Sequence, residues 1–168
     1  MKKTLLIIII LLTGCANTNS YVLGVDVRAM TKENIGETVL GAVVSVRTHV
    51  AGHYLVAEFL DIDIKQKGSL ETISRPDHHS NSALAWYARG GFVLQMGVGT
   101  ALVHLAPDSY FTRGYTVMAG TQILTYPLRY HEDKGDFTFL EGYEWPLYSA
   151  WSLYNMYLLN EKGGNHEK

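Results

Sequence analysis

The sequence has one cysteine, Cys15, in a chain of 168 residues. A single thiol cannot form an intramolecular disulfide, and it cannot supply the several sulfur ligands of a thiolate metal site. The chain beyond residue 14 also lacks a long uninterrupted apolar run, so we expect no transmembrane helix there. The role of Cys15 must therefore be sought in its position near the N-terminus.

Positive charge is the second scarce property of the sequence. Of the 14 basic side chains, two are Lys2 and Lys3 at the very start, so that 12 remain against 16 acidic ones over the rest. The resulting net charge of −4 lacks the basic patch that nucleic-acid binding requires. It also provides no polybasic segment for attraction to acidic lipids. Nucleic acid is therefore excluded as a partner.

The first 14 residues have the features of a secretory signal peptide. Lys2 and Lys3 precede an apolar run from Leu5 to Leu12, which is shorter than the roughly 20 residues of a bilayer-spanning helix. The segment Leu12-Thr13-Gly14-Cys15 resembles the lipobox of bacterial lipoproteins, in which a peptidase cuts before the cysteine and lipid is attached to it. The resemblance implies lipidation of Cys15; an ordinary signal peptide beside a chance cysteine is the alternative.

The same resemblance implies a location and a division of the chain. Ala16 stands where an inner-membrane retention signal would usually place Asp, so a Gram-negative host would sort the protein to its outer membrane. Any other host would hold it on the cell membrane. We predict a signal peptide over 1–14, an acylated tether over 15–20, one domain over 21–162 and a flexible tail over 163–168. The predicted partners are the membrane, through the lipid anchor, and an envelope protein or lipid.

Alternating apolar and polar residues predict β-strands through most of this domain. Over Val39–Val50, apolar side chains would occupy one face of a strand, with Ser45, Arg47 and His49 on the other. Ala51-Gly52 then predicts a hairpin turn into the next strand. Similar patterns recur further along the domain. We therefore predict a mainly β fold, an antiparallel small barrel or sandwich of six to eight strands.

The C-terminal part of the domain instead predicts one helix. Pro146 suits a helix start, and Gly163-Gly164 suits a helix end. Apolar side chains between them recur at helical spacing and would pack on the sheet, with Ser149, Ser152 and Asn155 on the opposite side. The predicted packing face consists of Leu147, Ala150, Trp151, Tyr154, Tyr157 and Leu158.

His78, Ser80 and Asn81 form the pattern His-x-Ser-Asn. This pattern resembles the signature of two outer-membrane barrel hydrolases, the lipid A 3-O-deacylase and the outer-membrane phospholipase A. The resemblance implies that His78 is the base, Ser80 the nucleophile and Asn81 a group that stabilises the oxyanion. The alternative is a polar loop that contains these residue types.

Two further groups of polar side chains come from the predicted strands. His49 and His53 have a spacing that would suit a pair of zinc ligands on a helix, but four residues of a strand span about 13 Å. Across the predicted turn the two histidines could meet, but the sequence shows no third ligand. Asp61 and Asp63, with Glu58 nearby, would lie on the wet face of a strand, where acidic residues are ordinary. The sequence therefore predicts no metal site and no cofactor.

The lipobox and the composition together predict a non-enzymatic envelope lipoprotein, whose domain is a binding or structural module at the membrane surface. A lipid or ester hydrolase that uses His78 and Ser80 is one alternative. A small barrel that holds an apolar ligand is another. The hydrolase requires a hydrogen bond between the histidine and the serine, whereas the ligand-binding barrel requires a closed interior cavity.

Overall fold

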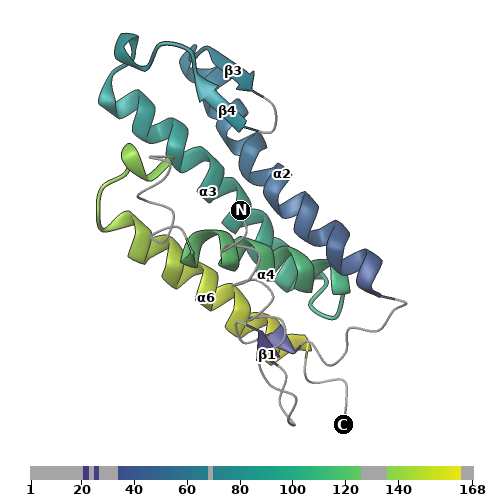
Figure 1. Cartoon of the computed structure of the whole chain (residues 1–168). Coiled ribbons are helices and arrows are strands. Elements are labelled where there is room, and N and C mark those ends of the chain that lie inside the picture. Colours follow the sequence, from purple (N-terminus) through teal and green to yellow (C-terminus); the bar gives the residue numbers. More distant parts are fainter. Residues whose placement is uncertain (1–20, 23–24, 27–33, 68–69, 126–135, 164–168) are drawn as a thin grey trace.

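The computed structural model describes residues 21–22, 25–26, 34–67, 70–125 and 136–163, and over these residues the chain is mainly helical (Figure 1). The predicted mainly β fold is therefore wrong, and the alternative of a ligand-binding barrel is wrong with it. The α-helices are α2 (Ile35–Leu60), α3 (Asn81–Leu105), α4 (Tyr110–Leu124) and α6 (Glu144–Gly163). The remaining elements are the hairpins β1 (Tyr21–Val22) with β2 (Val25–Asp26) and β3 (Ile64–Lys67) with β4 (Leu70–Ile73), and the 3-10 turns η1 (Pro76–His78) and η2 (Asp136–Thr138).

The lipobox lies outside the described residues. The signal peptide over 1–14, Cys15 and the tether that follows belong to this part of the chain, as do residues 164–168 of the tail. Lipidation of Cys15 therefore stays a prediction.

Helix α2 covers the segment predicted as two strands and a hairpin turn. Its β-branched valines give this segment the composition of a strand. The residues that face inward nevertheless recur at intervals of three and four, through Gly41, Ser45, His49 and Gly52, which is the period of a helix. Because α2 packs along both α3 and α4, tertiary contacts outweigh the strand propensity of the valines.

Local signals set where the helices begin and end. Ser80 and Ser109 directly precede α3 and α4, and their hydroxyls accept hydrogen bonds from backbone N–H groups in the first turn. Helix α2 ends at Asp61, which has a left-handed φ of 53°. The β3–β4 hairpin then returns the chain, so that α2 and α3 lie side by side in opposite directions (Figure 1).

Glycines allow α2 to lie very close to both neighbouring helices. A Cβ atom built on Gly114 of α4 would overlap the carbonyl oxygen of Thr38, and one built on Gly41 would overlap the backbone of α4. Gly52 of α2 and Gly90 of α3 meet in the same way. Backbone atoms cannot move aside as a flexible side chain can, so these helix contacts require glycine.

The substitution Gly114→Ala is expected to lower the free energy of unfolding by about 2 kcal/mol, because the added methyl group must push the backbone of α2 away. Gly97→Ala in α3 is the matched control, since no atom lies within 4 Å of a Cβ there. It should raise stability by about 0.5–1 kcal/mol, the usual gain of alanine over glycine in a helix. Urea unfolding followed by helical circular dichroism measures both; equal stabilities would contradict the close approach of α2 and α4.

The predicted C-terminal helix is confirmed, since α6 ends at Gly163 and includes Pro146 in its first turn. Its predicted orientation is wrong, because the polar side faces the interior and most of the apolar side faces outward. The buried polar side chains are Glu144, Ser149, Ser152 and Asn155, and the exposed apolar ones include Leu147, Leu153, Tyr154 and Tyr157.

Candidate metal centre

Two histidines and an aspartate from distant parts of the chain meet inside the helical bundle. His49 and His53 lie one turn apart in α2, and Asp136 of η2 lies 87 residues after His49. The Nε2 atoms of the two histidines are 3.0 Å apart. Oδ2 of Asp136 lies 3.1 Å from Nε2 of His49 and 3.3 Å from Nε2 of His53. Three atoms that can bind a metal ion therefore converge on one point.

The helical conformation of α2 is what brings the two histidines together. In a helix, residues four apart lie on the same side, one turn above the other. The hairpin predicted at Ala51-Gly52 is wrong, because both residues lie within α2. The separation of about 13 Å expected for a strand therefore does not apply.

Helix α3 provides the space and the walls for the two imidazole rings. A Cβ atom on Gly91 would lie 2.6 Å from Nε2 of His53 and 2.8 Å from Cε1 of His49, so a larger residue would displace the rings. The ring of Phe92 contacts the His49 ring edge-on, with 4.7 Å between the ring centroids. The ring of Tyr87 stacks on that of His53, with 4.6 Å between the centroids. The imidazoles are therefore held in fixed orientations.

Hydrogen bonding orients His53 for metal binding. Its Nδ1 lies 2.9 Å from the backbone carbonyl oxygen of Tyr87, which can only accept, so Nδ1 carries the proton and donates it. In the neutral ring, Nε2 then presents its lone pair to the centre, as in metal-bound histidines whose second nitrogen donates to a carbonyl. Nδ1 of His49 is buried and has no hydrogen-bond partner among the described residues.

The centre combines a buried environment with negative charge. His49 and His53 are 6% and 1% exposed, and the Asp136 side chain is 21% exposed. Burial raises the pKa of Asp136, but hydrogen bonds and electrostatic interactions with His49 and His53 outweigh it and hold this pKa well below its usual range. An ionised carboxylate in this position can accept a hydrogen bond from an imidazole N–H or bind a metal ion together with the imidazoles.

The distances between the three ligand atoms fit one metal ion. Zinc binds histidine nitrogen and carboxylate oxygen at about 2.0–2.2 Å. Ligand atoms separated by 3.0 to 3.3 Å subtend angles of about 90–105° at an ion placed about 2.1 Å from each of them. These angles lie between the octahedral and tetrahedral values, so the residues would occupy three adjacent positions and leave at least one position open.

The residues of the predicted His-x-Ser-Asn motif lie on the surface around the start of α3. The hydroxyl of Ser80 accepts a hydrogen bond of 3.2 Å from the backbone N–H of Ala83, and Asn81 is the exposed first residue of the helix. His78 belongs to η1, and its Nε2 lies 3.7 Å from the carboxylate of Asp77. Among the hydrogen bonds of the described residues, none joins His78 to Ser80. The structure thus gives Ser80 the role of a helix cap.

The substitution Ser80→Ala is expected to lower the free energy of unfolding by about 1 kcal/mol through loss of this cap. Ser80→Asp should retain most of the stability, because aspartate also caps helices well. Thermal unfolding compares the two variants with the wild-type protein. An unchanged midpoint in Ser80→Ala would contradict the capping role.

The acidic residues at and beyond the C-terminal end of α2, Glu58, Asp61 and Asp63, lie at the surface or take part in local structure. Asp61 ends the helix, Asp63 lies 3.7 Å from the guanidinium of Arg75, and Glu58 is exposed on α2. Within the described part of the chain, they belong to no group of three potential metal ligands. Glu58 and Asp63 are ordinary solvent-exposed carboxylates.

The chain matches no protein-family model, and searches of curated proteins and of solved structures find no match either. The geometry of the site is thus the basis for assigning its function. The spacing of His49 and His53 would have suited two zinc ligands on a helix, but the predicted strands led to the expectation of no metal site. Asp136 was missed, because nothing in its local sequence connects it to a pair of residues 87 and 83 positions earlier.

Proposed function

We propose that this protein binds a divalent transition-metal ion through His49, His53 and Asp136. The observation that carries the proposal is the convergence of three ligand atoms within 3.3 Å of one another. The hydrogen bond from His53 to the Tyr87 carbonyl supports it, because it fixes the tautomer that a metal ion needs.

The ligand set favours particular ions. Two imidazoles and one carboxylate suit zinc and ferrous iron, whereas magnesium and calcium prefer oxygen ligands alone. Zinc has no redox chemistry and accepts four or five ligands, which makes Zn²⁺ a suitable probe of the site.

The site as built supports binding better than peptide hydrolysis. In the H-E-x-x-H helices of zinc peptidases, the glutamate that follows the first histidine is the general base. Val50 occupies that position in this chain. We therefore propose an ion held by three protein ligands, with its open position available to water or to a small external ligand.

The lipobox supports a location for this metal-binding domain. We propose that lipid on Cys15 holds the domain on the envelope membrane, which agrees with an envelope module whose ligand is a metal ion. Mass spectrometry of the full-length protein purified from membranes should show a mature N-terminus at Cys15 with added acyl mass. Detection of an unmodified cysteine in the mature protein would contradict the anchor.

Metal content is the direct test of the binding site. Full-length protein is purified in detergent, stripped with a chelator and dialysed against Zn²⁺, and we expect one ion per chain. The double variant His49→Ala/His53→Ala should bind none. The matched control is His78→Ala/His104→Ala, which removes two exposed histidines and should retain the ion. Absence of zinc from the wild-type protein, or its retention in the first variant, would refute the proposal.

A further inference from the structure

The polarity of α2 is the reverse of that of a helix in a water-soluble core. Its buried positions hold small or polar residues such as Gly41, Ser45 and Ala57, while large apolar residues such as Leu40 and Val43 are exposed. Although the sequence predicted none, α2 is one helix of the described chain with the length and composition to cross a membrane. A soluble core helix can pass the same test but is mostly buried, whereas the apolar window of α2 is 28% buried.

Helix α6 shows this reversal over part of its surface, although it also buries large apolar residues such as Met156 and Leu159. Asn155 lies inside, where its Oδ1 accepts a hydrogen bond of 2.9 Å from Thr100 and its Nδ2 donates one of 3.3 Å to the Met96 carbonyl. Leu153 and Tyr154 on the outer side are each about half exposed. Inward polar side chains, close glycine contacts and outward apolar side chains are the features of helices that pack in lipid.

The outer side of α3 forms an apolar stripe along the whole helix. Trp86, Val93, Gly97, Ala101 and Leu105 follow one another at intervals of four or seven residues. Leu105 is 82% exposed, and Trp86 and Val93 are about half exposed. Leu105 lies 19 residues after Trp86, a rise of about 28 Å along the helix, which is close to the thickness of about 30 Å of a bilayer's hydrocarbon core.

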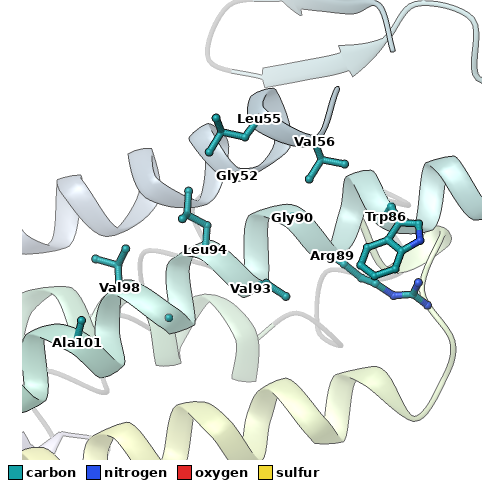
Figure 2. A pocket seen from close by; sticks show the side chains of 11 residues that line it. Gly52, Leu55, Val56, Trp86, Arg89, Gly90, Val93, Leu94, Val98 and Ala101 are labelled. Atoms are coloured by element: carbon teal, nitrogen blue, oxygen red, sulfur yellow. The ribbon is translucent and has the colours of Figure 1, made fainter. Parts of the chain in front are cut away.

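A shallow groove of about 440 Å³ runs beside this stripe, between α2 and α3 (Figure 2). Its floor is formed at Gly52 and Gly90, where the helices approach without intervening side chains. Figure 2 shows Leu55 on α2, with Val93 and Leu94 on α3, around this floor. The groove therefore offers an open, apolar surface to an elongated apolar group.

The charged side chains near the groove do not leave an unpaired charge on it. Arg89 lines one end, but its Nε donates a hydrogen bond of 2.7 Å to the carboxylate of Glu144, and its guanidinium lies 5.2 Å from the Trp86 ring. Arg47 and Glu58 line a separate hollow on another part of α2. These charges thus mark the border of the apolar surface.

We propose that acyl chains of a lipid bilayer cover the α2–α3 groove and the apolar stripe of α3. The nearness of a membrane rests on the proposed lipidation of Cys15. Tyr21 lies six residues after Cys15, and this length of chain spans at most about 21 Å, so an anchored domain would stay close to the bilayer. At that distance, an uncharged apolar surface is stabilised by contact with acyl chains rather than water. The proposal does not depend on the metal centre.

Spin labels on single cysteines test this contact directly. Val93→Cys and Ala101→Cys place a label on the stripe, and Asp77→Cys places one on the exposed η1 turn as the matched control. The full-length variants are reconstituted in vesicles of phosphatidylethanolamine and phosphatidylglycerol. Collision with oxygen, which concentrates in lipid, is compared with collision with a water-soluble nickel chelate. The wild-type protein gives the background from Cys15.

Lipid contact predicts high oxygen and low nickel accessibility at 93 and 101, and the reverse at 77. Equal nickel accessibility at all three positions would overturn the proposal, because the stripe would then face water. Low accessibility to both reagents at 93 and 101 would also overturn it, since another protein surface would then cover the stripe. The mass spectrum of Cys15 is measured independently of the spin labels. The lipid anchor and the contact of the stripe with lipid can therefore fail separately.

Discussion

Zinc added to the metal-free protein is expected to raise the free energy of unfolding by about 2.7 kcal/mol when free zinc exceeds the dissociation constant a hundredfold. The reason is that the three ligands converge only in the folded chain, where α2 and η2 are brought together. For a chain of this length, the gain corresponds to a rise of about 5–10 °C in the unfolding midpoint. Differential scanning calorimetry with and without zinc measures it.

The variant Asp136→Asn tests whether this stabilisation comes from the proposed centre. Asparagine keeps the shape of the side chain but removes the negative charge, and it binds zinc poorly. We expect this variant to lose most of the zinc-induced rise, while His104→Ala, which removes an exposed histidine, keeps it. An equal rise in Asp136→Asn and in the wild-type protein would show that zinc binds elsewhere.

Removal of the Glu144 carboxylate is expected to lower the free energy of unfolding by about 2 kcal/mol, because it leaves the charge of Arg89 unpaired in a partly buried position. The side chains of Arg89 and Glu144 are 23% and 5% exposed. Two hydrogen bonds of 2.7 and 3.3 Å join them and connect α3 to the start of α6. Urea unfolding of Glu144→Ala measures the loss.

Two variants separate an unpaired charge from a general effect of substitution. Glu58→Ala removes an exposed carboxylate from a helix and should change stability little. The double variant Arg89→Met/Glu144→Met removes both charges and should recover most of the loss, because apolar residues can replace a buried ion pair. If the double variant were as unstable as Glu144→Ala, packing rather than charge would be the cause.

The same ion pair predicts a dependence of stability on pH. Burial raises the pKa of Glu144, but hydrogen bonds from Arg89 and from the backbone N–H of Glu141, with the charge of Arg89, hold it below the ordinary 4.5. A carboxylate with a lowered pKa contributes stability above its ordinary value, and this contribution is lost as pH falls through the folded-state pKa. The stability difference between the wild-type protein and Glu144→Gln should therefore be full near neutral pH and decline below about 4.5.

The helix signals that the sequence displays most clearly are local, and they were interpreted correctly at the C-terminus. Pro146 and Gly163 indicated the two ends of α6 within a few residues. Such signals depend on the backbone preferences of single residues at helix ends. Ser80 is a further local signal, because a serine before a helix is a common cap. With His78 and Asn81 it also forms a pattern that resembles a hydrolase motif, and this pattern predicted a catalytic role instead.

The predicted β fold failed in α2 for a physical reason. Periodicity predicts structure on the assumption that apolar residues face the interior. In α2, Ser45 and His49 face the interior while Leu40 and Val43 face outward, so the usual pattern of polarity is inverted. The valine-rich composition of this segment then predicted strands. Its helical conformation follows from its packing against α3 and α4.

The sequence by itself determined the lipobox prediction at Cys15, the limits of α6 and the spacing of His49 and His53, because each of these is encoded within a few neighbouring residues. The tertiary structure alone decided that the two histidines share one side of a helix and that Asp136 meets them. It also decided that most large apolar residues of α2, and several of those of α6, face outward. These features depend on contacts between residues far apart in the chain, which no local pattern specifies.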